Sequence, residues 1–323
     1  MYRRQKIFVG FLVLLLLTLP VLAADPGPVP DEYYSFSFSF TTGMYSEFER
    51  ISTKDGWGSL SWSIDLPPGS PTPFGLAFDV DGSIYTTLNT LGAPEDVRSQ
   101  FAQVDGVTGE VTLIGAPFPI NTAGGDIDAC GNYYTTGFEV PALGYIWGDS
   151  NLYRIDKQTG VPTIIGDTGK TNWMDLAFDA EGTLWATTEN ELYTLDTTTG
   201  AATFVTEIHG VPNEAPPDFM EVMSIAFDHK GQLYGTAMTT LYFDPDWSPV
   251  MKIDTGTGDG KVVGYTHQVY NHGGDIMPKM VKVAHLKGNG NYQCVTIGMR
   301  DLDAHLKHGD YVPGAGSTGC DCP

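Results

Sequence analysis

The sequence predicts an all-β fold, a β-propeller in which five four-stranded sheets, or blades, surround a central axis. Three observations predict it. A strand pattern recurs about every fifty residues, a second pattern follows each copy, and the two ends of the repeat region resemble complementary parts of one further blade. One such sheet cannot bury both of its faces alone, so the copies have to pack against each other around an axis.

An inner strand that ends in a tight turn is the first repeated pattern. Its copies are residues 75–85, 175–185 and 224–234, with degenerate copies at 125–134 and 274–277. The aligned positions Asp79, Asp128, Asp179 and Asp228 are 49, 51 and 49 residues apart, and the same step reaches Met277 in the fifth copy. Asp and Gly after the strand suit a tight hairpin.

An Asp-x-x-Thr-Gly turn between two further strands is the second pattern. It begins at Asp105, Asp156, Asp196 and Asp254, and a short run with alternating apolar residues follows each turn. Alternation of this kind is typical of half-buried strands. Complete blades are therefore expected at 74–116, 124–166, 173–208 and 222–266.

The chain ends complete the ring in this interpretation. Residues 45–65 resemble the outer two strands of a blade, and residues 273–286 resemble the inner two. Pairing them closes the ring and removes exposed strand edges. The alternative is six blades, with 33–40 in a further one.

Four segments follow from this division. Residues 1–23 are expected to be a signal peptide, 24–44 an N-terminal linker or strand, 45–286 the propeller, and 287–323 a C-terminal Cys/His module.

The first residues have the pattern of an export signal. Arg3, Arg4 and Lys6 precede a nearly unbroken apolar stretch over 7–22, and Ala23 suits signal-peptidase cleavage. A retained membrane anchor is the alternative, but sixteen apolar residues fall short of the roughly twenty that a spanning helix needs. We expect a secreted, cell-surface or periplasmic protein without a membrane span after cleavage.

The chain is strongly acidic. It has 17 Lys and Arg against 39 Asp and Glu, and removal of the leader leaves 14 basic residues. Such a charge disfavours nucleic acid and anionic lipid, whose binding requires neutralisation of phosphates by basic side chains. Cationic partners or divalent metal ions fit the charge better.

The repeats resemble the broad class of secreted bacterial propellers related to the NHL and YWTD types. The resemblance rests on the Ala-Phe-Asp-x-x-Gly-x-Leu-Tyr and Asp-x-x-Thr-Gly patterns and covers most of the mature chain. It implies a fold and no particular function, because this architecture serves binders, scaffolds, lyases and hydrolases.

The tail is similar to a short C-terminal module of many bacterial secreted proteins. That module has a Val-Cys-His start, an Ala-His-Leu-x-His-Gly-Asp core, matched here by 304–310, and a final Cys. Ala284 stands where the module has its first Cys, which puts a disulfide carried over from the resemblance in doubt.

Two chemistries compete in the tail. His305 and His308 are three residues apart, which on a helix places both on one face, and Cys294 is a further candidate metal ligand. The alternative is a disulfide, since exported chains oxidise their thiols. Cys294 with Cys320 or Cys322 is the expected bridge.

Calcium is a second candidate cofactor. The segments 79–82, 126–128 and 179–182 resemble the start of a calcium loop, but none continues as an EF-hand. The competing interpretation is that Asp and Gly serve only the hairpin turn.

Enzyme motifs do not occur in the sequence: there is no Gly-x-Ser-x-Gly, no His-Glu-x-x-His and no phosphate loop. The catalytic residues therefore stay unknown. A ligand site is expected where the inner strands begin, at one mouth of the channel. The candidate ligand-binding residues there are Asp126, Trp173, Asp175, Glu221, His272 and Asp275, with longer loops at 142–149 and 212–221.

Three functions remain open from the sequence. The first is a monomeric, non-catalytic binding or surface protein that holds a protein or glycan ligand at the channel mouth. The second is a calcium-assisted hydrolase or lyase with its site at the same mouth. The third is a structural component of the cell envelope or matrix.

Overall fold

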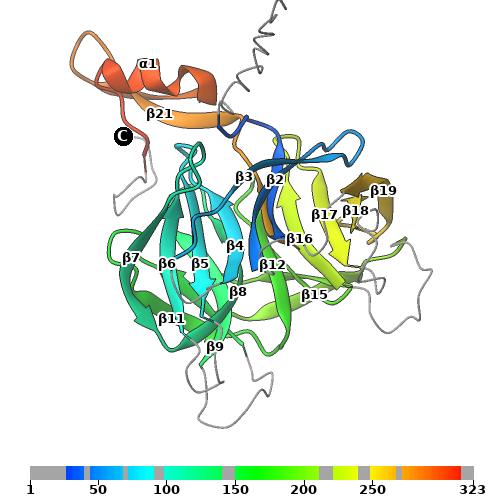
Figure 1. Ribbon diagram of the computed structural model, residues 1–323. Coiled ribbons are helices and arrows are strands. Elements are labelled where there is room, and N and C mark those ends of the chain that lie inside the picture. Colours follow the sequence, from blue (N-terminus) through cyan, green and yellow to red (C-terminus); the bar gives the residue numbers. More distant parts are fainter. Residues whose placement is uncertain are drawn as a thin grey trace, which may run out of the picture.

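The protein is described here by a computed structural model. The described residues are 27–39, 44–67, 72–90, 98–139, 150–210, 221–238, 248–266 and 271–313. They form five four-stranded antiparallel sheets and one two-stranded sheet (Figure 1). In this part of the chain no helix is long and apolar enough to cross a membrane. The expected signal peptide lies outside the described residues.

Four blades are continuous in sequence, each running from the axis outward. Blade 1 holds β4 (Thr72–Phe78), β5 (Ile84–Asn89), β6 (Ser99–Val104) and β7 (Val111–Phe118); blade 2 holds β8 (Ile120–Ile127), β9 (Tyr133–Glu139), β10 (Asn151–Ile155) and β11 (Pro162–Asp167); blade 3 holds β12 (Trp173–Phe178), β13 (Leu184–Thr188), β14 (Glu191–Leu195) and β15 (Ala202–Glu207); blade 4 holds β16 (Glu221–Phe227), β17 (Leu233–Met238), β18 (Ser248–Ile253) and β19 (Gly260–Thr266). The five-bladed propeller expected from the repeats is confirmed.

The fifth blade joins the two ends of the chain. Its inner strand is β20 (His272–Ile276), and β1 (Tyr33–Ser39), β2 (Met44–Ile51) and β3 (Gly58–Ser63) follow outward. Ring closure by pairing of the chain ends is therefore confirmed.

The number of strands that each end of the chain contributes to this blade differs from the sequence expectation. One strand comes from the C-terminal side and three from the N-terminal side, so residues 33–39 are neither a linker nor part of a sixth blade. The fit of Tyr33 explains this, because a Cβ on Gly274 would lie 2.5 Å from the Tyr33 ring. Residues 280–286, expected in the ring, belong to the tail instead.

Turn chemistry repeats with the strands. In all four Asp-x-x-Thr-Gly turns the Asp Oδ1 accepts the amide hydrogens two and three residues ahead, for example Val107 and Thr108 at Asp105. The final glycine has a positive φ, 76° at Gly109 and 83° at Gly200. Residues other than glycine rarely adopt this conformation, so the sequence pattern directly specifies the turn.

The hydrophobic core lies between the blades rather than within one layer. Five clusters of buried side chains each join two neighbouring blades. Between blades 5 and 1, for example, Tyr34 stacks on Phe48 and meets Phe78 edge-on. This arrangement stabilises the sheets through their neighbours.

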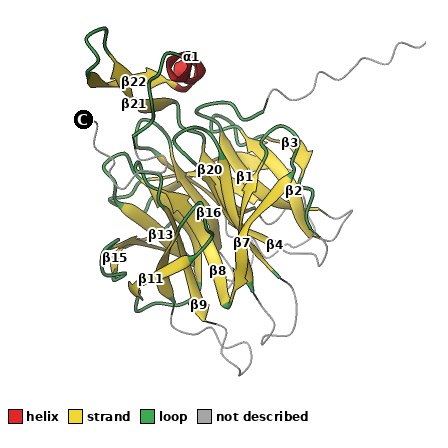
Figure 2. Cartoon of the chain, turned by 90° about the vertical axis from the view of Figure 1, so that its left-hand side faces the viewer, coloured by secondary structure: helices red, strands yellow, loops and turns green. Residues whose placement is uncertain are grey.

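The tail forms a small module outside the ring. It consists of the hairpin β21 (Met280–Leu286) and β22 (Tyr292–Gly298), a short 3₁₀ turn (Met299–Asp301) and helix α1 (Leu302–Lys307). The module lies at the end of the propeller where the inner-strand hairpins are, which we call the hairpin face (Figures 1 and 2). Its core side chains pack against Val80 and Met277 there.

Candidate functional site at the propeller axis

The inner strands meet at the axis through glycine or short side chains. The aligned positions in blades 1 to 5 are Gly75, Gly124, Asp175, Ser224 and Gly273. A Cβ on Gly75 would lie 2.5 Å from the carbonyl carbon of Gly124, and one on Gly273 would lie 2.6 Å from the Cα of Gly75. Neighbouring backbones are therefore in direct contact at this level.

Asp175 connects three blades. Its Oδ2 accepts the amide hydrogens of Ile225 in blade 4, at 2.9 Å, and of Gly274 in blade 5, at 3.0 Å. Blades 3 and 5 are not neighbours in the ring, so this carboxyl group lies inside the ring, at the axis. The residue is fully buried.

Asp126 and Asp275 each connect one pair of neighbouring blades. Asp126 accepts the amide hydrogen of Phe178, and Asp275 accepts that of Phe78 at 2.7 Å. Their second carboxylate oxygens accept the amide hydrogen of the next residue in their own strand. Both oxygens of each carboxyl group are thus hydrogen-bonded to backbone.

Asp126 and Asp275 occur where the inner strand and its neighbouring strand both differ in sequence from those of the other blades. Where blades 1, 3 and 4 have an aliphatic residue followed by Ala in the inner strand, blades 2 and 5 have Gly125-Asp126 and Gly274-Asp275. The space is filled from the second strand, because a Cβ on Gly125 would lie 2.2 Å from the Tyr133 hydroxyl oxygen. Tyr33 fills the equivalent space in blade 5.

Burial sets the protonation of this axial cluster, which we define as Asp126, Asp175, Asp275, Tyr33 and Tyr133. Loss of hydration raises the pKa of Asp275 to about 8, against the hydrogen bonds from backbone amides. Burial likewise raises the pKa of Asp126 and of Asp175 well above the usual range, and the neighbouring carboxyl groups add to the effect. Both tyrosines have a raised pKa for the same first reason.

Trp173 and His272, two further residues of the expected ligand site, pack against neighbouring side chains at the starts of their strands, Trp173 buried and His272 partly buried. Trp173 donates its indole N–H to the Thr168 hydroxyl at 3.0 Å and is 2% exposed. The His272 ring packs edge-on against Phe74, and burial lowers the pKa of His272 to about 4. Both side chains therefore pack against the propeller interior. The imidazole of His272 is neutral at neutral pH.

Glu221, the first residue of β16, is partly buried. Burial, and then the nearby Glu189, raise its pKa, while a hydrogen bond with Asn172 opposes the shift. Glu189 and Asn172 both have positive φ, 53° and 62°, which is uncommon for residues other than glycine. The Glu189 carbonyl accepts the Val222 amide hydrogen at 2.8 Å and so fixes this turn against blade 4.

The structure thus divides the six residues of the expected ligand site. Asp126, Asp175 and Asp275 come together at the axis. Trp173, Glu221 and His272 lie at the starts of their strands, at the propeller end opposite the hairpin face, where Trp173 is buried and Glu221 and His272 are partly exposed. We call this end the loop face. Ligand binding by any of them stays a prediction, and the loops 142–149 and 212–220 lie outside the described residues.

Similarity to known proteins is confined to the fold. No family model matches the chain, and no curated protein matches it. Among solved structures, a nidogen/laminin complex chain aligns with a TM-score of 0.45 at 14% identity, covering 76% of this chain and 97% of that one. A luciferin-regenerating enzyme aligns at 0.43 and 12%, covering 75% and 78%. A gluconolactonase from Xanthomonas campestris aligns at 0.42 and 14%, covering 76% and 79%. At such identities no activity transfers to this chain.

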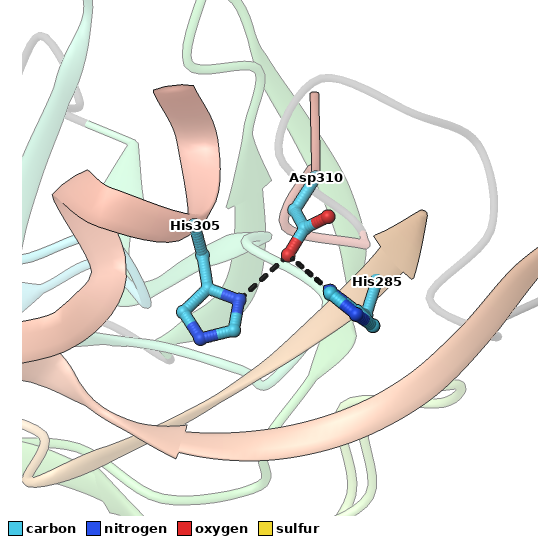
Figure 3. A group of neighbouring side chains, drawn as sticks. All are labelled: His285, His305 and Asp310. Atoms are coloured by element: carbon cyan, nitrogen blue, oxygen red, sulfur yellow. Dashed lines mark hydrogen bonds and ion pairs between the residues drawn. The ribbon is translucent and has the colours of Figure 1, made fainter. Parts of the chain in front are cut away.

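A second cluster of ionisable residues lies in the tail module. Asp310 Oδ2 is 2.8 Å from His285 Nδ1 and 2.6 Å from His305 Nδ1 (Figure 3). Asp310 Oδ1 accepts the Leu286 amide hydrogen at 2.8 Å. Burial opposes ionisation of this carboxyl group, but the hydrogen bonds outweigh burial and lower the pKa of Asp310.

The metal candidates named from the sequence separate in space. His305 belongs to the cluster with His285 and Asp310, but His308 ends helix α1 and is exposed. Cys294 is disulfide-bonded, as is Cys130. The pairing stays a prediction, because Cys320 and Cys322 lie outside the described residues.

The Asp residues of the hairpin turns accept backbone amides. Asp179 Oδ1 accepts those of Glu181 and Thr183, and Asp128 Oδ1 accepts those of Cys130 and Asn132. Asp79 differs, because its Oδ2 pairs with Lys157 of blade 2. These contacts agree with the interpretation that the repeated Asp and Gly serve the turn.

Sequence reasoning did not select Tyr33, Tyr133 or Glu49 as members of buried polar groups. A usable signal exists for the tyrosines, since Gly-Asp-Ile in two inner strands coincides with Tyr where other blades have Ile or Leu. Glu49 is fully buried in β2 and accepts a hydrogen bond from Asn271 at 2.7 Å, a contact 222 residues apart for which the sequence holds no signal.

Proposed function

We propose that this protein is an exported, monomeric, non-catalytic binding propeller whose loop face holds a partner with a cationic contact surface. The observation that best supports the non-catalytic part of this proposal is that the axial carboxyl groups are hydrogen-bonded to backbone amides. Both oxygens of Asp126 and of Asp275 are occupied by backbone amides, and Asp175 spans three blades. The carboxyl groups of Asp126 and Asp275 therefore have no oxygen left for proton transfer to a substrate or for calcium, and Asp175 is fully buried between the blades that it connects.

The loop face offers acids that are accessible. Glu189 is exposed and Glu221 is partly exposed, and the negative charge of Glu189 raises the pKa of Glu221. A cationic group placed between them relieves this repulsion. The net charge of −22 also favours encounter with a basic partner.

The backbone conformation near Glu221 also favours a binding site at the loop face. Asn172 and Glu189 adopt positive φ beside Glu221, in a region held by the bond from Val222 to the Glu189 carbonyl. Strained residues of this kind tend to gather at functional sites. The export signal in residues 1–23 supports an extracellular partner.

The test is a binding assay with mature protein from residue 24 onward. It is immobilised and exposed to a panel of basic proteins and to neutral glycans, at low and at high salt. The double variant E189Q/E221Q should weaken binding of the basic partner about tenfold or more, since about 1.4 kcal/mol corresponds to a factor of ten. The matched control D81N/E181Q removes two exposed charges from the hairpin face and should change affinity by less than about twofold.

Three results would overturn the proposal. Equal weakening in both double variants would mean unspecific attraction by net charge. Binding to glycans alone would replace the cationic partner by a sugar ligand. A hydrolytic activity that Asp175→Asn abolishes in a folded protein would restore the catalytic interpretation.

A further inference from the structure

The tail module brings together three metal-binding side chains from separate segments. His285 is near the end of β21, His305 is in α1, and Asp310 follows that helix. One ligand atom from each lies within 4.8 Å of the others. The Asp310 side chain is fully buried, whereas the His285 and His305 side chains are 43% and 28% exposed.

The orientation of the rings is specific. Both imidazoles direct Nδ1 at the same oxygen of Asp310 (Figure 3). The other oxygen is held by the Leu286 amide, so the carboxylate cannot turn away. A ligand fixed by such an outer hydrogen bond is a usual feature of protein metal sites.

Hydrogen bonding alone requires a special proton distribution here. A neutral imidazole carries one N–H, so both rings would have to place it on Nδ1. With a cation between the three atoms, both Nδ1 lone pairs are used and each Nε2–H faces outward. Both arrangements keep the imidazoles neutral, but only the second leaves each ring with its N–H on Nε2.

We propose that His285 Nδ1, His305 Nδ1 and Asp310 Oδ2 bind one divalent transition-metal ion of the zinc class. Two imidazoles and one carboxylate suit zinc, whereas calcium and magnesium prefer oxygen ligands throughout.

The small size of the module is compatible with a stabilising metal ion. Its buried core consists of Val281, Val283, Met299, Leu302 and Val312, and α1 has only six residues. So short a helix is marginal by itself. Structures of this size usually need a metal, disulfides or a partner. Cys294 of β22 is disulfide-bonded and Val80 and Met277 pack against the module, and the proposed ion would add a link between the helix and the hairpin.

The experiment uses untagged full-length mature protein, stripped with chelator and titrated with ZnCl₂ by calorimetry. Co²⁺ absorption provides a second readout. Wild-type protein should bind about one equivalent with nitrogen and oxygen ligation, and its thermal midpoint should rise. H285Q and H305Q should each weaken binding roughly tenfold or more. The control H308Q removes an exposed histidine from the end of the same helix and should bind like wild type.

Circular dichroism before titration ensures that each variant is folded. Wild-type protein that binds no stoichiometric zinc refutes the site without any variant. Equal affinity of H305Q and wild type also refutes it, as does binding of calcium in preference to zinc. If both single variants misfold, the Co²⁺ spectrum of wild type decides, because a spectrum without histidine ligation contradicts the proposal.

Discussion

A single carboxyl group at residue 175 holds parts of three blades. Its two backbone donors, Ile225 and Gly274, are buried and have no water to replace it. Its other oxygen has no hydrogen-bond partner among the described residues. A raised pKa fits this environment, because a neutral carboxyl group costs less to bury than a carboxylate.

Substitutions at Asp175 should separate hydrogen bonding from charge. Asp175→Ala leaves two buried amide hydrogens without an acceptor and should lower the free energy of unfolding by about 2–6 kcal/mol. Asp175→Asn keeps an acceptor and resembles the neutral acid, so it should cost about 1 kcal/mol or less. Urea unfolding of the two variants measures these free energies. Equal losses for both would contradict the role of the Asp175 carboxyl group as a hydrogen-bond acceptor between the blades.

Glu49 provides a pH test. Burial raises its pKa to about 8, partly opposed by the Asn271 hydrogen bond, so the folded protein keeps this proton at pH values where the unfolded chain has released it. The folded state binds more protons, and its stability therefore falls as pH rises from about 4.5 to 8.

Glu49→Gln should remove that part of the pH dependence. At pH 5 the variant and wild type should have similar unfolding free energies, whereas at pH 8 the variant should be more stable by about 1 kcal/mol or more. Urea denaturation at both pH values gives the difference. Parallel pH curves for the two proteins would show that Glu49 does not keep its proton.

At the scale of the strands, the axis depends on glycines that allow backbones to touch. Gly75 has a φ of 73°, and a Cβ there would meet Gly124 at 2.5 Å. Gly182 in a hairpin has a φ of 85°, but no atom lies within 4 Å of its Cβ position. The two glycines thus share a backbone conformation but differ in the space available for a Cβ atom.

Alanine at these positions should therefore differ in effect. Gly182→Ala should cost about 1 kcal/mol through backbone strain alone. Gly75→Ala adds a clash between backbones and should cost at least about 2 kcal/mol more. Chemical denaturation of both variants checks this, and similar values would mean that the inner strands are not in contact.

The elements show where sequence reasoning succeeds and where it stops. The ends of the inner strands at Phe78, Phe178 and Phe227 follow from the repeat, because each is followed by its own turn residues. The side chains that face the axis do not follow, since the pairing of all five inner strands contains a register shift, as between Phe74 and Leu76. Such a shift moves side chains between faces without a sequence mark.

Contacts between distant segments were equally hard to foresee. Placement of Tyr33 against Gly274 depends on residues 241 positions apart, so local patterns placed 33–40 outside the fifth blade. The acids of the candidate site do lie on inner strands, but the expectation that they lie at the strand starts was wrong for Asp126 and Asp275, which are near the ends of β8 and β20. Their depth depends on how closely glycine lets the blades approach, which no single repeat reveals.

For the molecule as a whole, closure of the ring depends on blade 5, which joins the two ends of the propeller. Strand β1 pairs with β20 and with β2, so it has a central position in a sheet although it is the first strand along the described residues. Blade 5 packs against blade 1 and blade 4 through buried aromatic and aliphatic side chains. The propeller should therefore open only as a unit.

Hydrogen–deuterium exchange of the mature protein tests this closure most directly. The amides of β1 should exchange as slowly as those of β12 on the opposite side of the ring, because both need global unfolding. Rapid exchange of residues 33–37 at the rate of an exposed linker, while β12 stays protected, would contradict the closed five-bladed ring.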